Sequence, residues 1–351
     1  MIERTQFGTM PDGQIVESFI MTNKNGISVE ILTLGAIIRS WTINDENQTD
    51  IVLGFDTVED YLADQGYIGR TVGRYANRIE KGQFSLGGVP FQVNTNLQGH
   101  CLHGGKDGFH NRLWRVTHID DDEQQMSLRL RIISQDGDQG FPGTLRVDVT
   151  FALDQDNGLT ITYEAESDAD TVFNPTQHSY FNLAGHDSGE VFEQSLQVVS
   201  RHYTPANSQG IPTGEIREVE GTAFDLNDAS KLEELIHHTD PQITAANGLD
   251  HNWCIENFDP KQQTLQLAAI ASDAKHGRKL LVHTTMPGVQ VYTGNFVGDK
   301  PKGKGDVTYG PYHAFCVESQ FYPNSPNESA FPSPELKAGE TFISKTRYQI
   351  L

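Results

Sequence analysis

The segment with the clearest chemical character spans residues 173–185 and reads FNPTQHSYFNLAG. It places one histidine, His178, among neutral hydrogen-bonding and aromatic side chains, with no strongly charged residue nearby. Histidine has the ordinary pKa that lies nearest to neutral pH, so it can give or take a proton there. This composition favours a wall that binds a polar, uncharged ligand and presents one titratable ring to it.

Three further residues suit the same kind of site. His103 stands before two glycines, where the backbone can come close to a ligand. Asp250 lies beside a histidine and an asparagine, and Glu318 directly follows an apolar, strand-like run. Two histidines and two carboxylates are a sufficient set for moving protons on a sugar-like hydroxyl.

Each of these residues also has a purely structural interpretation. A histidine in a strand is often a hydrogen-bonded core residue, and an aspartate after glycine often caps a turn. His103, with His100 and His110, could also ligate a metal, although no HExxH or paired CxxC spacing supports such a site. We expect Glu318 to be at least partly buried, which would raise its pKa and make it a better base near neutral pH.

The net charge argues against several classes of partner, and the cysteines indicate the redox compartment. The chain of 351 residues has a formal net charge of −21, whereas nucleic acids and anionic membranes require a basic surface. Its three cysteines are far apart and form no CxxC, which favours a reducing compartment. No run approaches the roughly 20 apolar residues of a membrane span, and no signal-peptide pattern is present. We expect a cytoplasmic protein without a nucleic-acid or membrane partner.

Period-two alternation of apolar and polar residues dominates the chain and predicts many half-buried strands. The clearest runs lie at residues 27–31, 126–132, 145–151, 159–163, 265–269 and 280–282. Short helices are expected only at residues 58–62 and 230–236. Because no repeat, heptad or low-complexity linker interrupts this pattern, we expect one all-β, antiparallel domain over residues 1–351.

The alternation also orients one candidate binding residue. If Val289 and Val291 face the core, then Gln290 and Tyr292 face the other side of the strand. Gln290 could contact a sugar hydroxyl if that side faces the ligand.

Taken together in their order along the chain, these motifs resemble the aldose 1-epimerase family, the galactose mutarotases. The resemblance covers nearly the whole chain and rests on the segments around His103, His178 and Asp250 and on residues 73–79, 136–143, 212–215, 221–225, 287–295 and 318–320. It implies a large antiparallel β-sandwich, the galactose mutarotase-like supersandwich, with a concave binding face. It also implies interconversion of the α and β anomers of free aldohexoses such as glucose and galactose, with no metal or other cofactor.

The resemblance assigns a role to each candidate residue. Glu318 would be the general base and His178 the proton donor to the ring oxygen, so the mechanism needs an ionised Glu318 and a protonated His178 together. Substrate binding would fall to Asn77, Arg78, His103, Tyr180, Asp250 and Gln290. Judged by pattern alone, Asn77 and Arg78 could instead close a turn, with Arg78 paired to Glu80.

Three alternative functions use overlapping residues. A glycoside hydrolase could use Asp250 and Glu318 as its two carboxylates. A non-catalytic sugar-binding module would keep Asp250 and Gln290 but would not need His178 with Glu318. A hexose-phosphate epimerase of similar fold would need several basic residues at one end of the site, and three arginines cluster in the sequence: Arg70, Arg74 and Arg78. The expected assembly is a monomer or a weak homodimer.

Overall fold

The computed structural model describes residues 1–351 and contains 26 β-strands and three short α-helices. The predicted all-β class with a few short helices is therefore confirmed. The helix expected at residues 58–62 is α1 (Val58–Ala63), and the one expected at 230–236 is α2 (Leu232–Ile236). Residues 230–231, at the start of that second range, form a short strand at the edge of a sheet instead. None of the helices is both long and apolar enough to cross a lipid bilayer.

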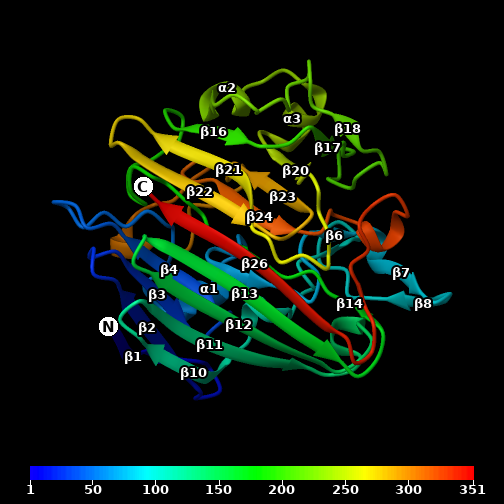
Figure 1. The fold of residues 1–351 in the computed structure, drawn as a ribbon, viewed down its shortest axis with the longest axis horizontal. Coiled ribbons are helices and arrows are strands. Elements are labelled where there is room, and N and C mark those ends of the chain that lie inside the picture. Colours follow the sequence, from blue (N-terminus) through cyan, green and yellow to red (C-terminus); the bar gives the residue numbers. More distant parts are fainter.

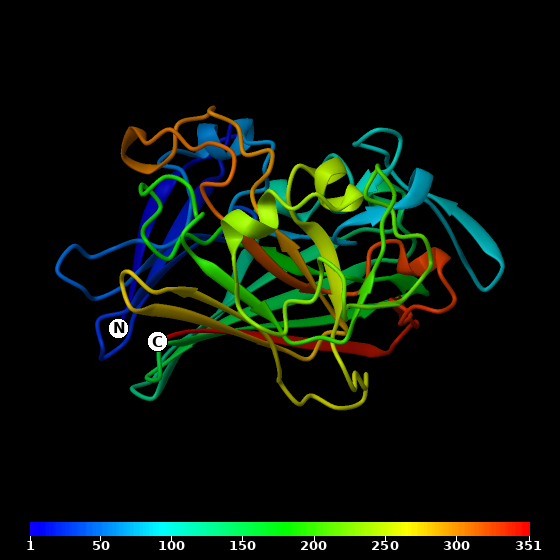
Figure 2. The ribbon, with the colours of Figure 1, turned by 90° about the horizontal axis from the view of Figure 1, so that it is seen from above.

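A nine-stranded antiparallel sheet forms one broad face of the molecule (Figure 1). Its strands in spatial order are β10 (Arg115–Asp121), β11 (Gln125–Ser134), β12 (Leu145–Asp154), β13 (Gly158–Ser167), β26 (Thr341–Ile350), β22 (Arg278–Thr284), β21 (Gln266–Asp273), β16 (Ser195–Val198) and β19 (Ser230–Lys231). The helices α2 and α3 and several long connections lie on the side opposite to this sheet (Figure 2).

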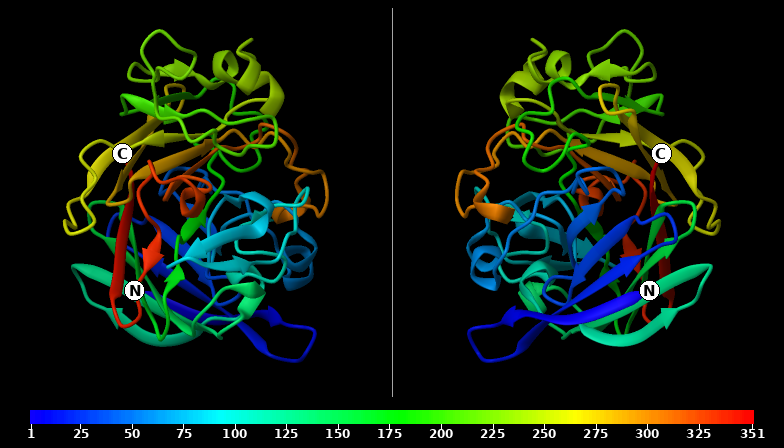
Figure 3. Two further views of the ribbon diagram at one scale, coloured as in Figure 1. Left: turned by 90° about the vertical axis from the view of Figure 1, so that its right-hand side faces the viewer. Right: turned by 90° about the vertical axis from the view of Figure 1, so that its left-hand side faces the viewer.

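Two smaller antiparallel sheets complete the sandwich. The N-terminal sheet, drawn in blue beside the β10 edge of the large sheet in Figure 3, consists of β1 (Ile2–Thr9), β2 (Ile15–Thr22), β3 (Ser28–Leu32) and β4 (Ile37–Thr42). The five-stranded sheet consists, in spatial order, of β18 (Arg217–Glu218), β17 (His202–Thr204), β20 (Asp250–Cys254), β23 (Gly288–Tyr292) and β24 (Cys316–Gln320). Four two-stranded pairs remain: β5 (Arg70–Val72) with β15 (Thr176–His178), β6 (Arg78–Ile79) with β9 (Cys101–Leu102), β7 (Gln83–Leu86) with β8 (Val89–Gln92), and β14 (Thr171–Val172) with β25 (Glu335–Leu336).

One hydrophobic core of 54 buried residues draws on all three large sheets, from Phe19 on β2 to Ile350 on β26. On β23 and β24 the inward side chains are Val289, Val291 and Val317. Because strand side chains alternate between faces, the polar residues between these valines point away from the core. The predicted orientation of Val289 and Val291 is confirmed, and the opposite face of these strands carries the polar groups described below.

The third helix, α3 (Pro241–Ala246), was not predicted from the sequence. It has strong local signals, since the Asp240 side chain caps it by accepting from the Gln242 N–H at 2.8 Å and Pro241 occupies its first turn. Asn247 ends it in a left-handed conformation. The helix is too short to show a hydrophobic period, which is why periodicity did not reveal it.

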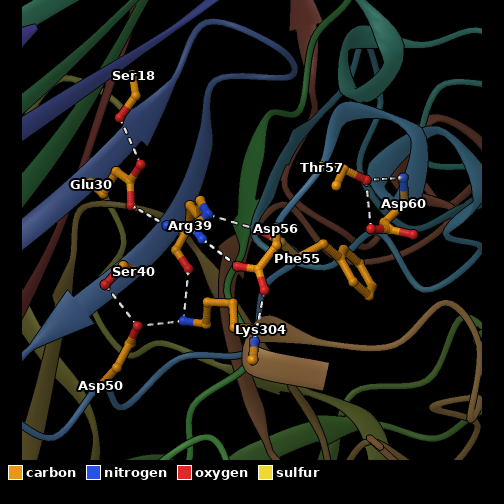
Figure 4. Close-up of polar contacts among 12 residues, drawn as sticks. Ser18, Glu30, Arg39, Ser40, Asp50, Phe55, Asp56, Thr57, Asp60 and Lys304 are labelled. Carbon is orange, nitrogen blue, oxygen red and sulfur yellow. Dashed lines mark hydrogen bonds and ion pairs between the residues drawn. The ribbon is translucent and has the colours of Figure 1, made fainter. Parts of the chain in front are cut away.

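A buried ion network fastens the segment between β23 and β24 to the N-terminal sheet (Figure 4). The Lys304 ammonium contacts the Asp50 carboxylate and donates to the backbone carbonyl of Arg39 at 3.0 Å. Arg39 in turn pairs with Glu30 and Asp56, each at 2.6 Å. The network therefore joins the connection between β23 and β24 to β4 and to the residues that follow β4.

Replacing Lys304 by methionine should destabilise the protein strongly. The change keeps most of the packing of the side-chain stem but leaves Asp50 as an unpaired, nearly buried charge, for which a loss of about 3–5 kcal/mol is typical. Urea unfolding curves measure the loss. Lys337→Met is the matched control, because Lys337 pairs with Asp170 at the surface, where ion pairs contribute little. Equal losses in the two variants would contradict this interpretation of the network.

Candidate active site

A cavity of about 450 Å³ opens on the polar face of β20, β23 and β24, within the size range of small-molecule sites. Seven of the eight predicted site residues line it: Asn77, Arg78, His103, His178, Tyr180, Asp250 and Glu318. They come from five different strands or loops that are far apart in sequence. The structure therefore brings together the segments that the sequence analysis selected.

His178 and Glu318 meet at the base of the cavity. His178 ends β15 and Glu318 lies at the centre of β24, and both side chains are almost fully buried. Nε2 of His178 lies 3.6 Å from Oε1 of Glu318. The other carboxyl oxygen, Oε2, has no hydrogen-bond partner within the protein. The expectation that Glu318 is buried is confirmed, and its only ion-pair partner within 4.0 Å is His178.

Burial shifts the pKa values of both groups toward their neutral forms. It raises the pKa of Glu318 well above its ordinary range, and the nearby negative charge of Asp250 raises it further. It also lowers the pKa of His178 to about 4. At a pH between these two pKa values the pair therefore carries one proton, on Glu318. This is the reverse of the arrangement expected from the sequence, although the total number of protons is the same.

Two tyrosines hold the imidazole of His178 in place. The Tyr180 ring stacks on it with centroids 5.0 Å apart, and the Tyr180 hydroxyl donates to the backbone carbonyl of Gly66 at 2.7 Å. Tyr67 also lies nearly parallel to His178, at 6.2 Å, and meets His103 edge-on at 4.6 Å. Tyr67 was not predicted from the sequence, where its only signal is its place between two closely spaced glycines.

His103 is locked in one neutral tautomer. Its Nδ1 accepts the backbone N–H of Asn77 at 3.1 Å, so the ring hydrogen must reside on Nε2. Protonating Nδ1 would break this bond, and burial also lowers the pKa of His103 well below its ordinary value. A second cavity histidine, His251, likewise accepts the Asp250 backbone N–H at its Nδ1 (3.1 Å). Both rings can donate a hydrogen bond from Nε2 but are poorly suited to becoming imidazolium ions.

The same tautomer argues against a metal ion in the cavity. Ligand atoms of His103, His178 and Glu318 lie within 4.8 Å of one another, a spacing that could hold a cation. However, Nε2 of His103 carries a hydrogen and has no free lone pair for a metal, because Nδ1 is occupied. The histidine set considered from the sequence is not assembled either, because the group of possible ligands includes neither His100 nor His110.

Asp250 forms the opposite polar wall of the cavity. Its Oδ1 accepts from the Gln290 amide at 2.7 Å, and its Oδ2 lies 3.6 Å from Nη2 of Arg78. Arg78 therefore pairs with Asp250 and not with Glu80, the alternative raised from the sequence. Gln290 is on the expected face but does not line the cavity, because it lies behind Asp250 and holds that carboxylate.

The other two arginines of the sequence cluster point elsewhere. Arg70 donates to the Asn111 side chain and the His110 carbonyl. Arg74 is buried in a cage of backbone carbonyls and donates to those of Pro142 at 2.7 Å and Gly143 at 2.9 Å. Only Arg78 reaches the cavity, and it is already paired. A basic pocket for a phosphate group is therefore not formed.

Gly104 has a different purpose from the one expected. It was predicted to let the backbone approach a ligand, but a Cβ atom there would lie 2.0 Å from the carbonyl oxygen of Gly73. The glycine therefore permits two protein segments to pack together, and its φ of +83° also favours glycine. This contact holds the His103 turn, itself left-handed with φ 50°, against the segment that leads to Arg78.

The rim of the cavity was not foreseen from the sequence. It is built by residues 206–210, by Gln242, Ala245 and Ala246 on α3, and by Phe296, which is 65% exposed. These residues belong to loops and to the unpredicted helix, and no motif marked them.

The fold and the site together define a class of protein. A β-sandwich presents one carboxyl group and one unlocked imidazole at the base of a cavity with polar, mostly uncharged walls. Such a pair can take a proton from one ligand oxygen and give one to another, which is the chemistry of an acid–base isomerase acting on a small polyhydroxylated substrate.

Comparison with known proteins identifies the family. The family model described as aldose 1-epimerase matches residues 17–349. The chain is 37% identical to the galactose mutarotase of Mus musculus over 99% of this chain and 98% of that protein, and 34% identical to the aldose 1-epimerase of Escherichia coli K12 over 97% of each. The crystal structure of galactose 1-epimerase from Lactobacillus acidophilus NCFM superposes with a TM-score of 0.86 and 26% identity, covering 100% of this chain and 98% of that one. The chain belongs to the aldose 1-epimerase family, and it is an isomerase that interconverts the anomers of aldoses.

Removing divalent metals should leave this activity unchanged. The reason is the tautomer of His103: its Nε2 carries a hydrogen and therefore cannot serve as the third ligand of a cation. Optical rotation of a freshly dissolved α-aldose, followed before and after dialysis against EDTA, measures the effect. Activity that falls on dialysis and returns with a divalent ion would contradict the assigned tautomer.

Proposed function

We propose that the substrates are free aldohexoses such as glucose and galactose and that His178 and Glu318 carry the chemistry. The observation that carries this proposal is the 3.6 Å approach of Nε2 of His178 to Oε1 of Glu318 at the base of the cavity. An aldohexose has two oxygens on carbon 1, the anomeric hydroxyl and the ring oxygen. One must lose a proton while the other gains one, and two adjacent titratable groups suit that task.

The proposed reaction opens and recloses the sugar ring. Glu318 takes the proton of the anomeric hydroxyl, whose electrons form the C1 carbonyl, and His178 as imidazolium protonates the ring oxygen as the C1–ring-oxygen bond breaks. Rotation about the C1–C2 bond then presents the other face of the aldehyde. The ring recloses as both proton transfers run in reverse, so no proton is gained or lost overall.

The reactive form differs from the resting form by one internal proton shift. Burial favours the proton on Glu318 at rest, whereas the proposed reaction requires it on His178. The two arrangements carry the same total charge, and the ion pair gains from the attraction between its charges at short range. Hydrogen bonds from the substrate to the ionised carboxylate would favour the reactive form further.

The remaining polar groups suit roles in substrate binding. His103 can donate from Nε2 to a sugar oxygen, and Asp250 can accept from hydroxyls on the opposite wall. Asn77 and Arg78 complete that wall, and Tyr180 contributes the ring that orients His178. Gln290 acts by holding Asp250.

None of the alternative functions is favoured. A hexose-phosphate epimerase lacks support because Arg70 and Arg74 bind backbone and side-chain oxygens outside the cavity. A binding module or a hydrolase would not account for the family membership. We further propose that the chain works as a single domain, as a monomer or weak homodimer, in the cytoplasm and without nucleic-acid or membrane partners. The three free cysteines are compatible with that compartment.

Glu318→Gln and His178→Asn should each lower kcat by about 10²–10⁴-fold with much smaller changes in KM, since each keeps the shape of the site but removes a proton-transfer group. Polarimetry of α-galactose and α-glucose measures both constants. Glu164→Gln and His283→Asn, on the outer face of the large sheet, are matched controls and should behave as the unaltered protein does. Near-normal kcat in either site variant would refute the role assigned to that residue.

The pH dependence of the same proteins separates the two roles. The unaltered enzyme needs one proton on the His178–Glu318 pair. Its rate should therefore fall below about pH 4, where the pair takes up a second proton on His178. It should fall again above the raised pKa of Glu318, where the pair loses its remaining proton. In His178→Asn the residual rate should only rise with pH, because just the ionised form of Glu318 is still required. An alkaline decline that survives in this variant would mean that another group donates the proton.

Asp250→Ala should weaken galactose binding more than Gln290→Ala. Hydrogen bonds to a charged group contribute about 1.5–3 kcal/mol and neutral ones about 0.5–1.5 kcal/mol, and about 1.4 kcal/mol is tenfold in affinity. Gln290 also acts only through Asp250. Calorimetric titration with galactose gives both affinities, and the reverse order would show that Gln290 contacts the sugar directly.

A further inference from the structure

Both ring nitrogens of His178 face side chains of the same strand. Nε2 lies 3.6 Å from the Glu318 carboxylate, and Nδ1 lies 3.6 Å from the Cys316 sulfur. Cys316 and Glu318 are two positions apart on β24 and therefore point to the same side of the strand. Cys316 has no exposed surface, so its thiol meets the imidazole inside the protein and away from solvent.

The proposed reaction places a strict demand on the hydrogens of this ring. When His178 has given its Nε2 proton to the sugar ring oxygen, it is neutral, and its remaining hydrogen must stay on Nδ1. Nε2 then has a free lone pair and can take the proton back as the ring recloses. A neutral imidazole with its hydrogen on Nε2 could not do so. Which nitrogen carries the hydrogen is set by the partner of the other nitrogen.

The other two cavity histidines show the opposite arrangement. Nδ1 of His103 and Nδ1 of His251 each accept a backbone N–H, which places the hydrogen of each ring on Nε2. Only at His178 does Nδ1 face a group that can accept a hydrogen bond. A thiol sulfur is a weak acceptor as well as a weak donor.

We propose that Cys316 is a positioning residue for catalysis: its sulfur accepts the Nδ1–H of His178 and so keeps Nε2 as the atom that shuttles the proton. This inference rests on the proposed role of His178 as the acid. Cys316 itself exchanges no proton with the substrate. The Nε2 proton moves to the ring oxygen and returns, while the Nδ1 hydrogen remains between the ring and the sulfur.

A neutral sulfur suits this position better than a carboxylate would. Burial raises the pKa of the Cys316 thiol well above its ordinary range, so the thiol stays uncharged. A carboxylate here would stabilise the imidazolium and raise the pKa of His178. The ring oxygen of a sugar is a very weak base, so a more weakly acidic imidazolium would protonate it less readily. The thiol thus orients the ring without weakening it as an acid.

Cys316→Ser and Cys316→Ala test the proposal as a matched pair. Serine and alanine are similar in size and leave a similar gap in packing, but only serine keeps an atom that can accept from Nδ1. We expect kcat to fall about 10–100-fold in Cys316→Ala, the usual range for lost orienting partners, and considerably less in Cys316→Ser. Cys254→Ala, which removes a buried thiol outside the cavity, should leave kcat unchanged.

Nitrogen-15 NMR of histidine-labelled protein provides a readout that packing alone would not move. The His178 signals are identified by their absence in His178→Asn. We expect the hydrogen on Nδ1 in the unaltered protein and in Cys316→Ser, and a shift toward the Nε2–H form in Cys316→Ala. If a Cys316 variant fails to fold, the tautomer of His178 in the unaltered protein still tests the proposal.

The outcomes separate this inference from the proposed function. Equal losses of kcat in the serine and alanine variants, no loss in either, or an Nε2–H tautomer in the unaltered protein would overturn the role of Cys316 alone. A fully active His178→Asn variant would instead overturn the acid itself, whatever the result at Cys316.

Discussion

The burial of His178 and Glu318 beside one another, with Nε2 and Oε1 3.6 Å apart, is the constraint on which the rest of the site depends. Removing water from both groups shifts the pKa of each toward its neutral form, in opposite directions. Between those two pKa values the pair holds one proton, on Glu318, and moving that proton to His178 would leave the total charge of the pair unchanged. An isomerase that returns every proton it takes needs that kind of pair, and solvent around it would allow the two groups to titrate independently.

The sandwich achieves this burial through alternation along two strands. Val289, Val291 and Val317 belong to the large core, and the same strands carry Glu318 on their other face. The core thus fixes the strand that bears Glu318, while the cavity lies over the opposite face. The Lys304 network separately joins the connection between β23 and β24 to the N-terminal sheet.

Sequence patterns predicted the parts of the structure that follow from local rules. Alternation revealed strands such as β11, β12 and β13, and it placed Val289 and Gln290 on opposite faces. It could not show that Gln290 lies behind Asp250, because that depends on how far β20 and β23 bring their side chains together. Tyr67 was missed for a related reason, since its left-handed backbone, with φ 57°, is imposed by tertiary contacts. Gly104 and Arg74 were noticed, but their purposes depend on the backbone of distant segments.

Which ring nitrogen of each cavity histidine can carry a hydrogen likewise depends on tertiary contacts. His103, His178 and His251 have the same side chain and all lie in a buried, polar cavity. They differ in what faces Nδ1. A backbone N–H cannot accept a hydrogen bond, so it confines His103 and His251 to neutral rings that donate from Nε2. A sulfur can accept one, so the proposed contact with Cys316 would allow His178 to carry hydrogens on both nitrogens. If His178 is the acid, as proposed, that choice among three equivalent side chains depends on the atoms that face Nδ1.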